Sequence, residues 1–310
     1  MQIQELNDSN TVEKCILTFG NFDGIHLGHR HLLDQVINLG KKNNLPVVLL
    51  TFDPHTNKIV FNNKKLKVLT SFDDKANLLT SANIDVLCKI IFNEKFAKLK
   101  AEEFIDIIIS KYNPKIIMIG YDNYFGFNKE GSYNFLIKNK KFSKIEIITT
   151  EKYTLDGENI KSSVIKKLLT ECKIEKVNNF IGRKYSLKGV VSRGDNISTL
   201  TGFKTANIKL KNNEQLIPGN GVYSVSLRID KNDYPSVCNI GYCPTIKNSS
   251  KISIEVHVID ESLELYNKSA EVFFNRFIRA EKKFDNVQNL KNQISKDIKS
   301  IKERILNRGW

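Results

Sequence analysis

The sequence predicts an α/β domain with a parallel sheet, followed by an antiparallel β barrel that ends in one long helix. Three patterns predict this order. Apolar runs alternate with helical stretches in the first half, short strand-like runs follow one another in the second, and the last residues carry an apolar stripe at helical spacing. The 310 residues, 41% of them hydrophobic, suit two domains better than one. We expect these domains at residues 1–182 and 183–310.

The parallel sheet is predicted by runs that are apolar on both faces and are separated by helical stretches. The runs cover residues 15–19, 46–52, 85–92, 115–120 and 144–150. The stretch 29–40 predicts a helix that ends at Gly40, because glycine is favoured just past a helix C-terminus. A second amphipathic helix is predicted over 101–112.

The pattern changes near residue 180. A helical stretch over 162–182 gives way to short strands separated by Gly, Pro, Asn and Asp, which is typical of an antiparallel sandwich or barrel. These strands are expected at 185–194, 205–210, 221–229, 236–242, 252–259 and 270–278. The stripe of the terminal helix consists of Val287, Leu290, Ile294, Ile298, Ile301 and Ile305.

The composition predicts where the protein acts and which partners it lacks. The net charge is +14, but the lysines are spread along the chain. This distribution favours a solvated surface over a nucleic-acid interface. The charge would still attract polyphosphates. The five cysteines form no CxxC pair or zinc pattern, which is typical of reduced thiols in a cytoplasm. No apolar run approaches the roughly 20 residues of a membrane span, and the N-terminus lacks the apolar core of a signal peptide. We expect a cytoplasmic protein with neither a membrane nor a nucleic-acid partner.

A phosphate site is predicted where the first strand gives way to the first helix. Three glycines, Gly20, Gly24 and Gly28, let the backbone approach a ligand closely. His26 and His29, three residues apart, can face the same way and donate to phosphate oxygens at the helix start. A bare pair of histidines at this spacing is more often structural, but its place at the carboxyl end of a strand favours function. Neither a Walker A loop nor an HExxH zinc motif is present.

The segment GNFDGIHLGH resembles the signature of the HxGH nucleotidyltransferases. Its wider context resembles the prokaryotic bifunctional riboflavin kinase/FAD synthetase family, over nearly the whole chain. The other matching segments, in order, are TFDPHT, LTSFDDKANLL, FAKLKAEEFI, IGYDNYFGFNKEG, GFKTANI, PGNGVYSV, NIGYCPTI, IEVHVID and IRAEKKFDNVQNLKNQISKDI.

For the first domain, the resemblance implies a Rossmann-like FMN adenylyltransferase that joins FMN to ATP, giving FAD and pyrophosphate. His26 and His29 would be catalytic and would stabilise the α-phosphate and the departing pyrophosphate, with Mg²⁺ bridging phosphate oxygens. The residues implied to bind the nucleotide and its phosphates are Gly20, Phe22, Asp23, Gly24, Gly28, Asp122, Ser162, Ser163 and Lys166. Lys166 stands where the family has arginine, which keeps the charge but loses bidentate geometry, and Lys161 stands where the family has serine.

For the second domain, the resemblance implies a riboflavin kinase, a β barrel that transfers the γ-phosphate of ATP to the ribityl 5′-hydroxyl. Thr205 and Asn207 would ligate Mg²⁺ through hard oxygens. Glu255 would be the catalytic base, and Arg279 would bind flavin. Without the resemblance, Glu255 and Arg279 are indistinguishable from solvent-facing charges.

Three departures from the family pattern leave an alternative open. Ser198, Thr199 and Lys204 replace the family's glycine, arginine and proline. The kinase domain is therefore either active or degenerate, and in the second case only the FMN adenylyltransferase would remain. A non-catalytic flavin- or nucleic-acid-binding protein is a further alternative, and a cytidylyltransferase would leave the second half unexplained. The expected substrates are riboflavin, FMN and ATP, and the expected state is a monomer or weak homo-oligomer.

Overall fold

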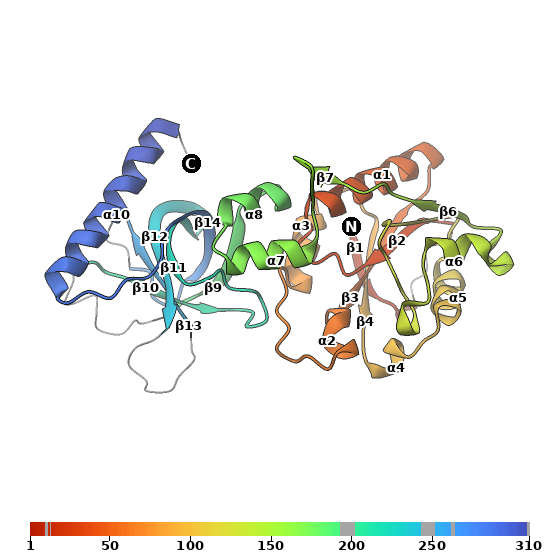
Figure 1. The fold of residues 1–310 in the computed structure, drawn as a ribbon. Coiled ribbons are helices and arrows are strands. Elements are labelled where there is room, and N and C mark those ends of the chain that lie inside the picture. The colour runs from red at the N-terminus through yellow and green to blue at the C-terminus, as the bar shows by residue number, and fades with distance from the viewer. Residues whose placement is uncertain (10–11, 13, 193–201, 243–251, 262–263, 309–310) are drawn as a thin grey trace. The chain divides into compact units, whose positions relative to one another are not determined.

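A computed structural model describes the chain except for residues 10–11, 13, 193–201, 243–251, 262–263 and 309–310 (Figure 1). The chain forms two compact units, Met1–Ser162 and Ser163–Trp310. The helical stretch before residue 182 thus falls with the second unit, whereas the expected functional boundary lies after it. That boundary stays a prediction.

The first unit contains the predicted parallel sheet, with the strand order β1-β4-β3-β2-β5-β6. The strands are β1 (Gln2–Glu5), β2 (Ile16–Gly20), β3 (Val47–Asp53), β4 (Val86–Ile91), β5 (Ile116–Ile119) and β6 (Glu146–Thr149). A separate two-stranded sheet consists of β7 (Thr154–Leu155) and β8 (Glu158–Asn159). The edge strand β1 was not predicted, because four residues with a single apolar side chain carry no periodic signal.

Both faces of the parallel sheet are covered. Ile16 and Leu17, neighbours on β2, belong to two different buried clusters, as side-chain alternation along a strand requires. This explains why the strands are apolar throughout. The helical segments are α1 (Leu27–Asn43), α2 (Thr56–Val60), α3 (Phe72–Leu79), α4 (Glu94–Ala97), α5 (Ala101–Tyr112), η1 (Phe127–Lys129), α6 (Tyr133–Lys138) and η2 (Lys140–Phe142).

The first helix does not end at Gly40, so that prediction was wrong. α1 continues to Asn43 and is capped by Asn44, which adopts the left-handed conformation. Gly40 lies inside the helix, where a Cβ would come within 2.6 Å of a Val47 methyl carbon. The glycine therefore permits close packing of α1 against β3.

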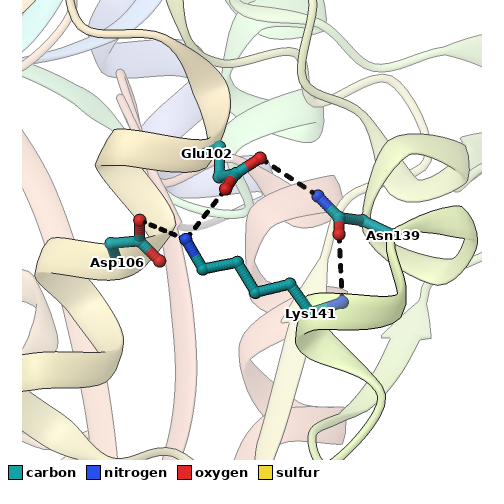
Figure 2. A network of polar contacts seen from close by, with 4 residues as sticks. All are labelled: Glu102, Asp106, Asn139 and Lys141. Atoms are coloured by element: carbon teal, nitrogen blue, oxygen red, sulfur yellow. Dashed lines mark hydrogen bonds and ion pairs between the residues drawn. The ribbon is translucent and has the colours of Figure 1, made fainter.

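An exposed polar network joins α5 to η2 (Figure 2). Lys141 forms ion pairs with Glu102 at 2.8 Å and with Asp106 at 2.6 Å. Asn139 accepts a hydrogen bond from the Lys141 backbone N–H and donates one to Glu102. The three charged side chains are nearly half exposed, so water screens the pairs.

The second unit is built on a closed antiparallel barrel, with the strand order β10-β13-β12-β11-β14-β9. This confirms the barrel and excludes the sandwich. The strands are β9 (Tyr185–Ser192), β10 (Ala206–Leu210), β11 (Gly221–Ile229), β12 (Asn232–Tyr242), β13 (Ile252–Val258) and β14 (Ser269–Arg279). Cys238, Ile240, Ile254 and Val256 are buried and alternate with less buried residues along β12 and β13.

Among the described residues, three helices accompany the barrel. The stretch predicted as helical over 162–182 is two helices, α7 (Ser162–Thr170) and α8 (Ile174–Ile181), separated at Cys172, whose φ is 60°. The terminal helix α10 (Val287–Arg308) follows the prediction. Ile301 of its apolar stripe packs in one buried cluster with Val222 and Val237, whereas Val287 is 43% exposed. Among the described residues, no helix is both long and apolar enough to cross a membrane.

Candidate functional site

The parallel sheet has a topological switch point beside β2. The chain leaves β2 through α1 and reaches β3 on one side, whereas β5 pairs with β2 on the other. Ligands of open α/β sheets bind at the carboxyl ends of strands at such a point. The segments after the two strands meet there, because the Asn123 side chain donates a 2.8 Å hydrogen bond to the Phe19 carbonyl.

The structure brings His26 and His29 together at this edge. Their rings stack with centroids 3.6 Å apart and planes 15° apart. His26 caps α1, since its Nδ1 accepts a 3.2 Å hydrogen bond from the His29 backbone N–H. A neutral His26 therefore carries its proton on Nε2. The Phe22 ring lies 5.2 Å from the His29 ring and would contact any side chain at Gly20.

Asp23 braces the turn between β2 and α1. Its Oδ1 accepts hydrogen bonds from the backbone N–H groups of Leu69, at 2.7 Å, and Thr70, at 3.2 Å. The Thr70 hydroxyl accepts in return from the Gly24 N–H, at 3.0 Å. The carboxylate is buried, so these bonds offset the cost of removing its charge from water. The sequence motif predicts nucleotide binding for Asp23, and this contact with the backbone of residues 69 and 70 is visible only in the folded chain.

Two glycines of the turn lie where an added Cβ would meet close neighbours, and the contact is prohibitive at Gly24. Gly24 has φ +94°, and a Cβ there would lie 2.7 Å from a Leu69 methyl carbon. A Cβ at Gly28 would lie 3.3 Å from the His26 ring and 3.7 Å from the Ile160 carbonyl oxygen. The helix start that carries the histidines is thus packed closely against the segment that leads into α7.

Lys75 lies below the turn and was missed by the sequence analysis. Its ammonium group donates to the Asn21 carbonyl at 3.1 Å and to the Thr51 hydroxyl at 3.0 Å. Burial lowers the pKa of Lys75 to about 8, although Asp23 and Asp53 act in the opposite direction. A buried lysine that ties the ends of two adjacent strands is visible only after folding, because a lysine inside a helical segment reads as a surface residue.

The segment before α7 also reaches this edge. The Ser162 hydroxyl donates a 2.8 Å hydrogen bond to the Asp23 carbonyl. Lys161 forms a 2.8 Å ion pair with Asp122 after β5, and this carboxylate raises the pKa of Lys161. Lys161 also lies 5.7 Å from the centre of the Tyr121 ring. Residues from three separate segments therefore meet at the switch point.

Six of the predicted residues belong to the second unit. Ser163 and Lys166 lie in the first two turns of α7. Arg279, the last residue of β14, is held by Asp297 of α10, with its Nε and Nη2 within 3.2 Å of the carboxylate. The side chain of Arg279 is 16% exposed and that of Asp297 5%. The structure thus gives Arg279 a contact that fastens α10 to the barrel.

A row of polar residues crosses four neighbouring strands of the barrel. Asn207 on β10 is the register partner of Glu255 on β13, and Glu255 is in turn the partner of Asn239 on β12. Ser192 on β9 is the partner of Asn207 on its other side. Directly opposed side chains share a face of a sheet, and the buried Val256 beside Glu255 places this row on the outer face. Sequence reasoning assigned no role to Ser192 or to Asn239, although Asn239 begins the matching segment NIGYCPTI.

The segment before β10 is held against β13. The ring of His257 forms a 2.8 Å hydrogen bond through Nδ1 with the Lys204 carbonyl. The Phe203 ring meets the same imidazole edge to face, with centroids 5.2 Å apart. Thr205 follows directly and is half-buried. The other altered positions, 198 and 199, lie outside the described residues.

The donor atoms in the barrel suit a metal that arrives with a nucleotide. Thr205 offers a hydroxyl and Asn207 a carboxamide oxygen, both hard ligands. Within the described ranges, no three His, Cys, Asp or Glu side chains form a group that could hold a metal ion. Mg²⁺ commonly keeps several waters and binds through few protein oxygens and substrate phosphates, so this donor set fits it.

The two units match two different family models. A model for FAD synthetase matches residues 8–164, and a model for riboflavin kinase matches residues 181–305.

Curated bacterial proteins are similar to the chain over nearly its whole length. A protein of Buchnera aphidicola subsp. Schizaphis graminum is 37% identical, over 97% of this chain and 96% of its own. A Listeria monocytogenes protein is 33% identical over 91% and 90%, and one from Escherichia coli K12 is 32% identical over 94% and 93%. All three are named bifunctional riboflavin kinase/FMN adenylyltransferase.

A solved structure has the same fold. A crystal structure described as a macrolide-efflux protein from Streptococcus pneumoniae is similar with a TM-score of 0.88 and 25% identity, over 96% of this chain and 97% of that one. That description applies to the other protein, and the similarity supports the fold. On the two family models and the curated relatives, the chain belongs to the family of bifunctional riboflavin kinase/FMN adenylyltransferases.

Proposed function

We propose that this chain carries out both reactions named for its relatives, phosphorylating riboflavin to FMN and adenylylating FMN to FAD. The observation that carries the proposal is the pairing of Asn207 with Glu255, because the kinase half is the part that the altered motifs put in question. Phosphoryl transfer to an alcohol requires an oxygen ligand for the metal ion and a base for the hydroxyl proton. Asn207 and Glu255 supply these two groups from neighbouring strands.

In adenylyl transfer, the FMN phosphate attacks the α-phosphorus of ATP in line with the departing pyrophosphate. The attacking oxygen is already an anion, so the reaction needs positioning and charge stabilisation and no side-chain base. His26 and His29 are proposed to donate hydrogen bonds to the α-phosphate and to pyrophosphate. The tautomer that capping imposes on His26 supports this, since it places a donor on Nε2.

The remaining phosphate contacts are proposed to come from the start of α7. Ser162 and Ser163 can donate hydroxyl hydrogen bonds, and Lys166 lies one helical turn beyond Ser162. Asp122 is proposed to lie beside the nucleotide, where its ion pair with Lys161 keeps the loop after β5 in place. Gly20, Phe22, Asp23, Gly24 and Gly28 shape the turn around the phosphates.

In phosphoryl transfer, Glu255 is proposed to take the proton of the ribityl 5′-hydroxyl as that oxygen attacks the γ-phosphorus, and ADP leaves as the bond from the γ-phosphorus to the β–γ bridging oxygen breaks. Thr205 and Asn207 are proposed to hold Mg²⁺ by their oxygens. When bound, Mg²⁺ supplies positive charge to the phosphate oxygens of ATP. Arg279 is proposed to bind flavin from the end of β14, at a position that Asp297 fixes.

The contact made by Lys204 supports an active kinase. This residue replaces the proline of the family motif, and its backbone carbonyl is bound to His257. A proline also has that carbonyl, so the substitution preserves the contact. The alternative of an adenylyltransferase with a degenerate kinase domain is therefore not favoured.

The proposal is tested by incubating the purified full chain with riboflavin, ATP and Mg²⁺ and separating the flavins by chromatography. Both FMN and FAD are expected. FAD from added FMN, with no product from riboflavin, would refute the kinase half, and no product from either substrate would refute the whole proposal. Tight, steeply salt-dependent DNA or RNA binding without turnover would favour a nucleic-acid-binding protein.

We also propose that the chain acts in the cytoplasm as a monomer or weak homo-oligomer. The thiols of Cys15, Cys88, Cys172 and Cys238 are free, which supports a reducing compartment. Size-exclusion chromatography with light scattering tests the oligomeric state.

A further inference from the structure

We propose that His257 is a positioning residue of the phosphoryl-transfer site. Its imidazole fixes the segment that leads into β10, so that Thr205 and Asn207 are held beside Glu255. The inference rests on the riboflavin kinase activity proposed above. It goes beyond that proposal because His257 contacts neither substrate nor metal in the role assigned to it.

The His257 ring makes two contacts with the segment, one polar and one apolar. Its Nδ1 lies 2.8 Å from the Lys204 carbonyl oxygen, which can only accept, so Nδ1 carries the proton and donates. The Phe203 ring packs edge to face against the same imidazole, at an interplanar angle of 83°. Protonation of the ring would keep the Nδ1–H donor, so the bond does not depend on the charge of the imidazole.

The contacts of His257 lie just beyond the end of the β10–β13 ladder. The paired residues are Ala206 with Val256 and Asn207 with Glu255. One further step of the same register would bring Thr205 opposite His257, but the described ladder begins at Ala206. The His257 side chain therefore supplies a tie where the backbone pairing stops. Of the two proposed metal ligands, Thr205 lies outside the strand and depends most on that tie.

The His257 side chain lies on the same face of the barrel as the residue whose site it is proposed to position, Glu255. His257 lies two residues after Glu255 on β13, so both side chains are on the outer face of the barrel. A loose Phe203–Thr205 segment would misplace the Thr205 hydroxyl without changing Glu255 itself. Loss of the tie should therefore weaken use of Mg²⁺–ATP more than use of riboflavin, because small misplacements of a binding group weaken catalysis strongly.

The test uses the full chain with His257→Ala, His257→Asn and His257→Phe. Asparagine keeps a short side-chain donor and loses the ring, whereas phenylalanine keeps the ring and loses the donor. Ser253→Ala is the matched control, since Ser253 lies on the same strand and face, two residues before Glu255. Initial rates of FMN formation are measured with Mg²⁺–ATP varied at saturating riboflavin, and then with the two roles exchanged.

His257→Ala is expected to raise the KM for Mg²⁺–ATP about 10- to 100-fold, with little change in the KM for riboflavin. His257→Asn should recover part of the loss, and Ser253→Ala should behave like the unaltered chain. FAD formation from FMN should persist in every variant, because that chemistry is assigned to the first domain, and measurable FMN formation shows that the barrel itself is folded. If His257→Ala proves insoluble, the comparison of His257→Asn with His257→Phe decides.

Two results would overturn the inference. One is unchanged Mg²⁺–ATP kinetics in a folded His257→Ala protein, and the other is an equal rise in the KM values for both substrates. Either result requires an unaltered chain that makes FMN. An unaltered chain that makes FAD from FMN, but no FMN from riboflavin, refutes the proposed kinase activity itself, so the two failures are distinguishable.

Discussion

Asn207 and Glu255 are direct partners across β10 and β13, although they lie in separate parts of the sequence. Directly opposed residues in an antiparallel pair have Cβ atoms about 4.5–5.5 Å apart, so the amide and the carboxylate can serve one reacting group. The barrel thereby supplies the geometry that the linear motifs KTAN and IEVHVID only suggest.

Replacing Glu255 should abolish one reaction and spare the other. Glu255→Gln keeps the shape of the side chain but removes the base, and we expect FMN formation to fall by about 10²- to 10⁴-fold. FAD formation from FMN should be unchanged, because that chemistry is assigned to the domain proposed at residues 1–182. Chromatography of the flavins measures both rates in one preparation, and Ser253→Ala serves as the control. Equal loss of both activities would contradict the division of labour.

Replacing His29 should have the opposite effect. His29→Ala removes one of two stacked donors, and we expect FAD formation from FMN to fall by about 10²- to 10³-fold. Riboflavin phosphorylation should be unaffected. His31→Ala, on the same helix, is the control, since the His31 ring contacts Gln35 and Tyr153 and has no proposed role. A comparable loss in His31→Ala would point to a general disturbance of α1.

The glycine at position 24 should be irreplaceable for reasons of space. Gly24→Ala puts a Cβ at φ +94° and 2.7 Å from Leu69, whereas Gly157→Ala puts one at φ +77° with nothing within 4 Å. We expect Gly157→Ala to lower the free energy of unfolding by about 1 kcal/mol and Gly24→Ala by at least about 2 kcal/mol. Urea unfolding followed by circular dichroism measures both. Equal losses would mean that the turn relaxes around the new methyl group.

The fold class was predictable because both patterns it depends on are local. Strands buried on both faces are apolar throughout, and the short strands of the barrel are separated by turn residues. The end of α1 was not predictable, because Gly40 is required by Val47, and this contact exists only in the folded chain. The histidine pair could be placed from spacing and position together.

The contacts that hold the two sites could not be predicted. Lys75 and His257 lie in segments that match the family, but neither was assigned a role, because each acts through the backbone carbonyl groups of distant segments. Asp23 was predicted as a nucleotide ligand, yet its described bonds are to the backbone N–H groups of residues 69 and 70. Backbone partners leave no trace in side-chain identity, so sequence reasoning finds the groups that do chemistry more readily than those that position them.

Lys75 should make stability depend on pH in a way that identifies it. Its pKa is about 8 in the folded chain, below the usual 10.5, because burial disfavours the charged form. Between these values the unfolded chain holds a proton that the folded chain has released, so stability rises with pH. The gain is about 3 kcal/mol across the interval, since one pKa unit corresponds to about 1.4 kcal/mol.

The measurement compares urea unfolding of the unaltered chain with that of Lys75→Met from pH 7 to pH 11. The difference in unfolding free energy should be flat below pH 8, should rise in favour of the unaltered chain up to about pH 10.5, and should level off above it. Lys141→Met is the matched control, because Asp106 and Glu102 raise the pKa of Lys141, so its proton is lost later in the folded chain than in the unfolded one. Its difference curve should turn the other way at high pH. Parallel curves for the unaltered chain and Lys75→Met would show that the ammonium group is not held in the buried position below the turn.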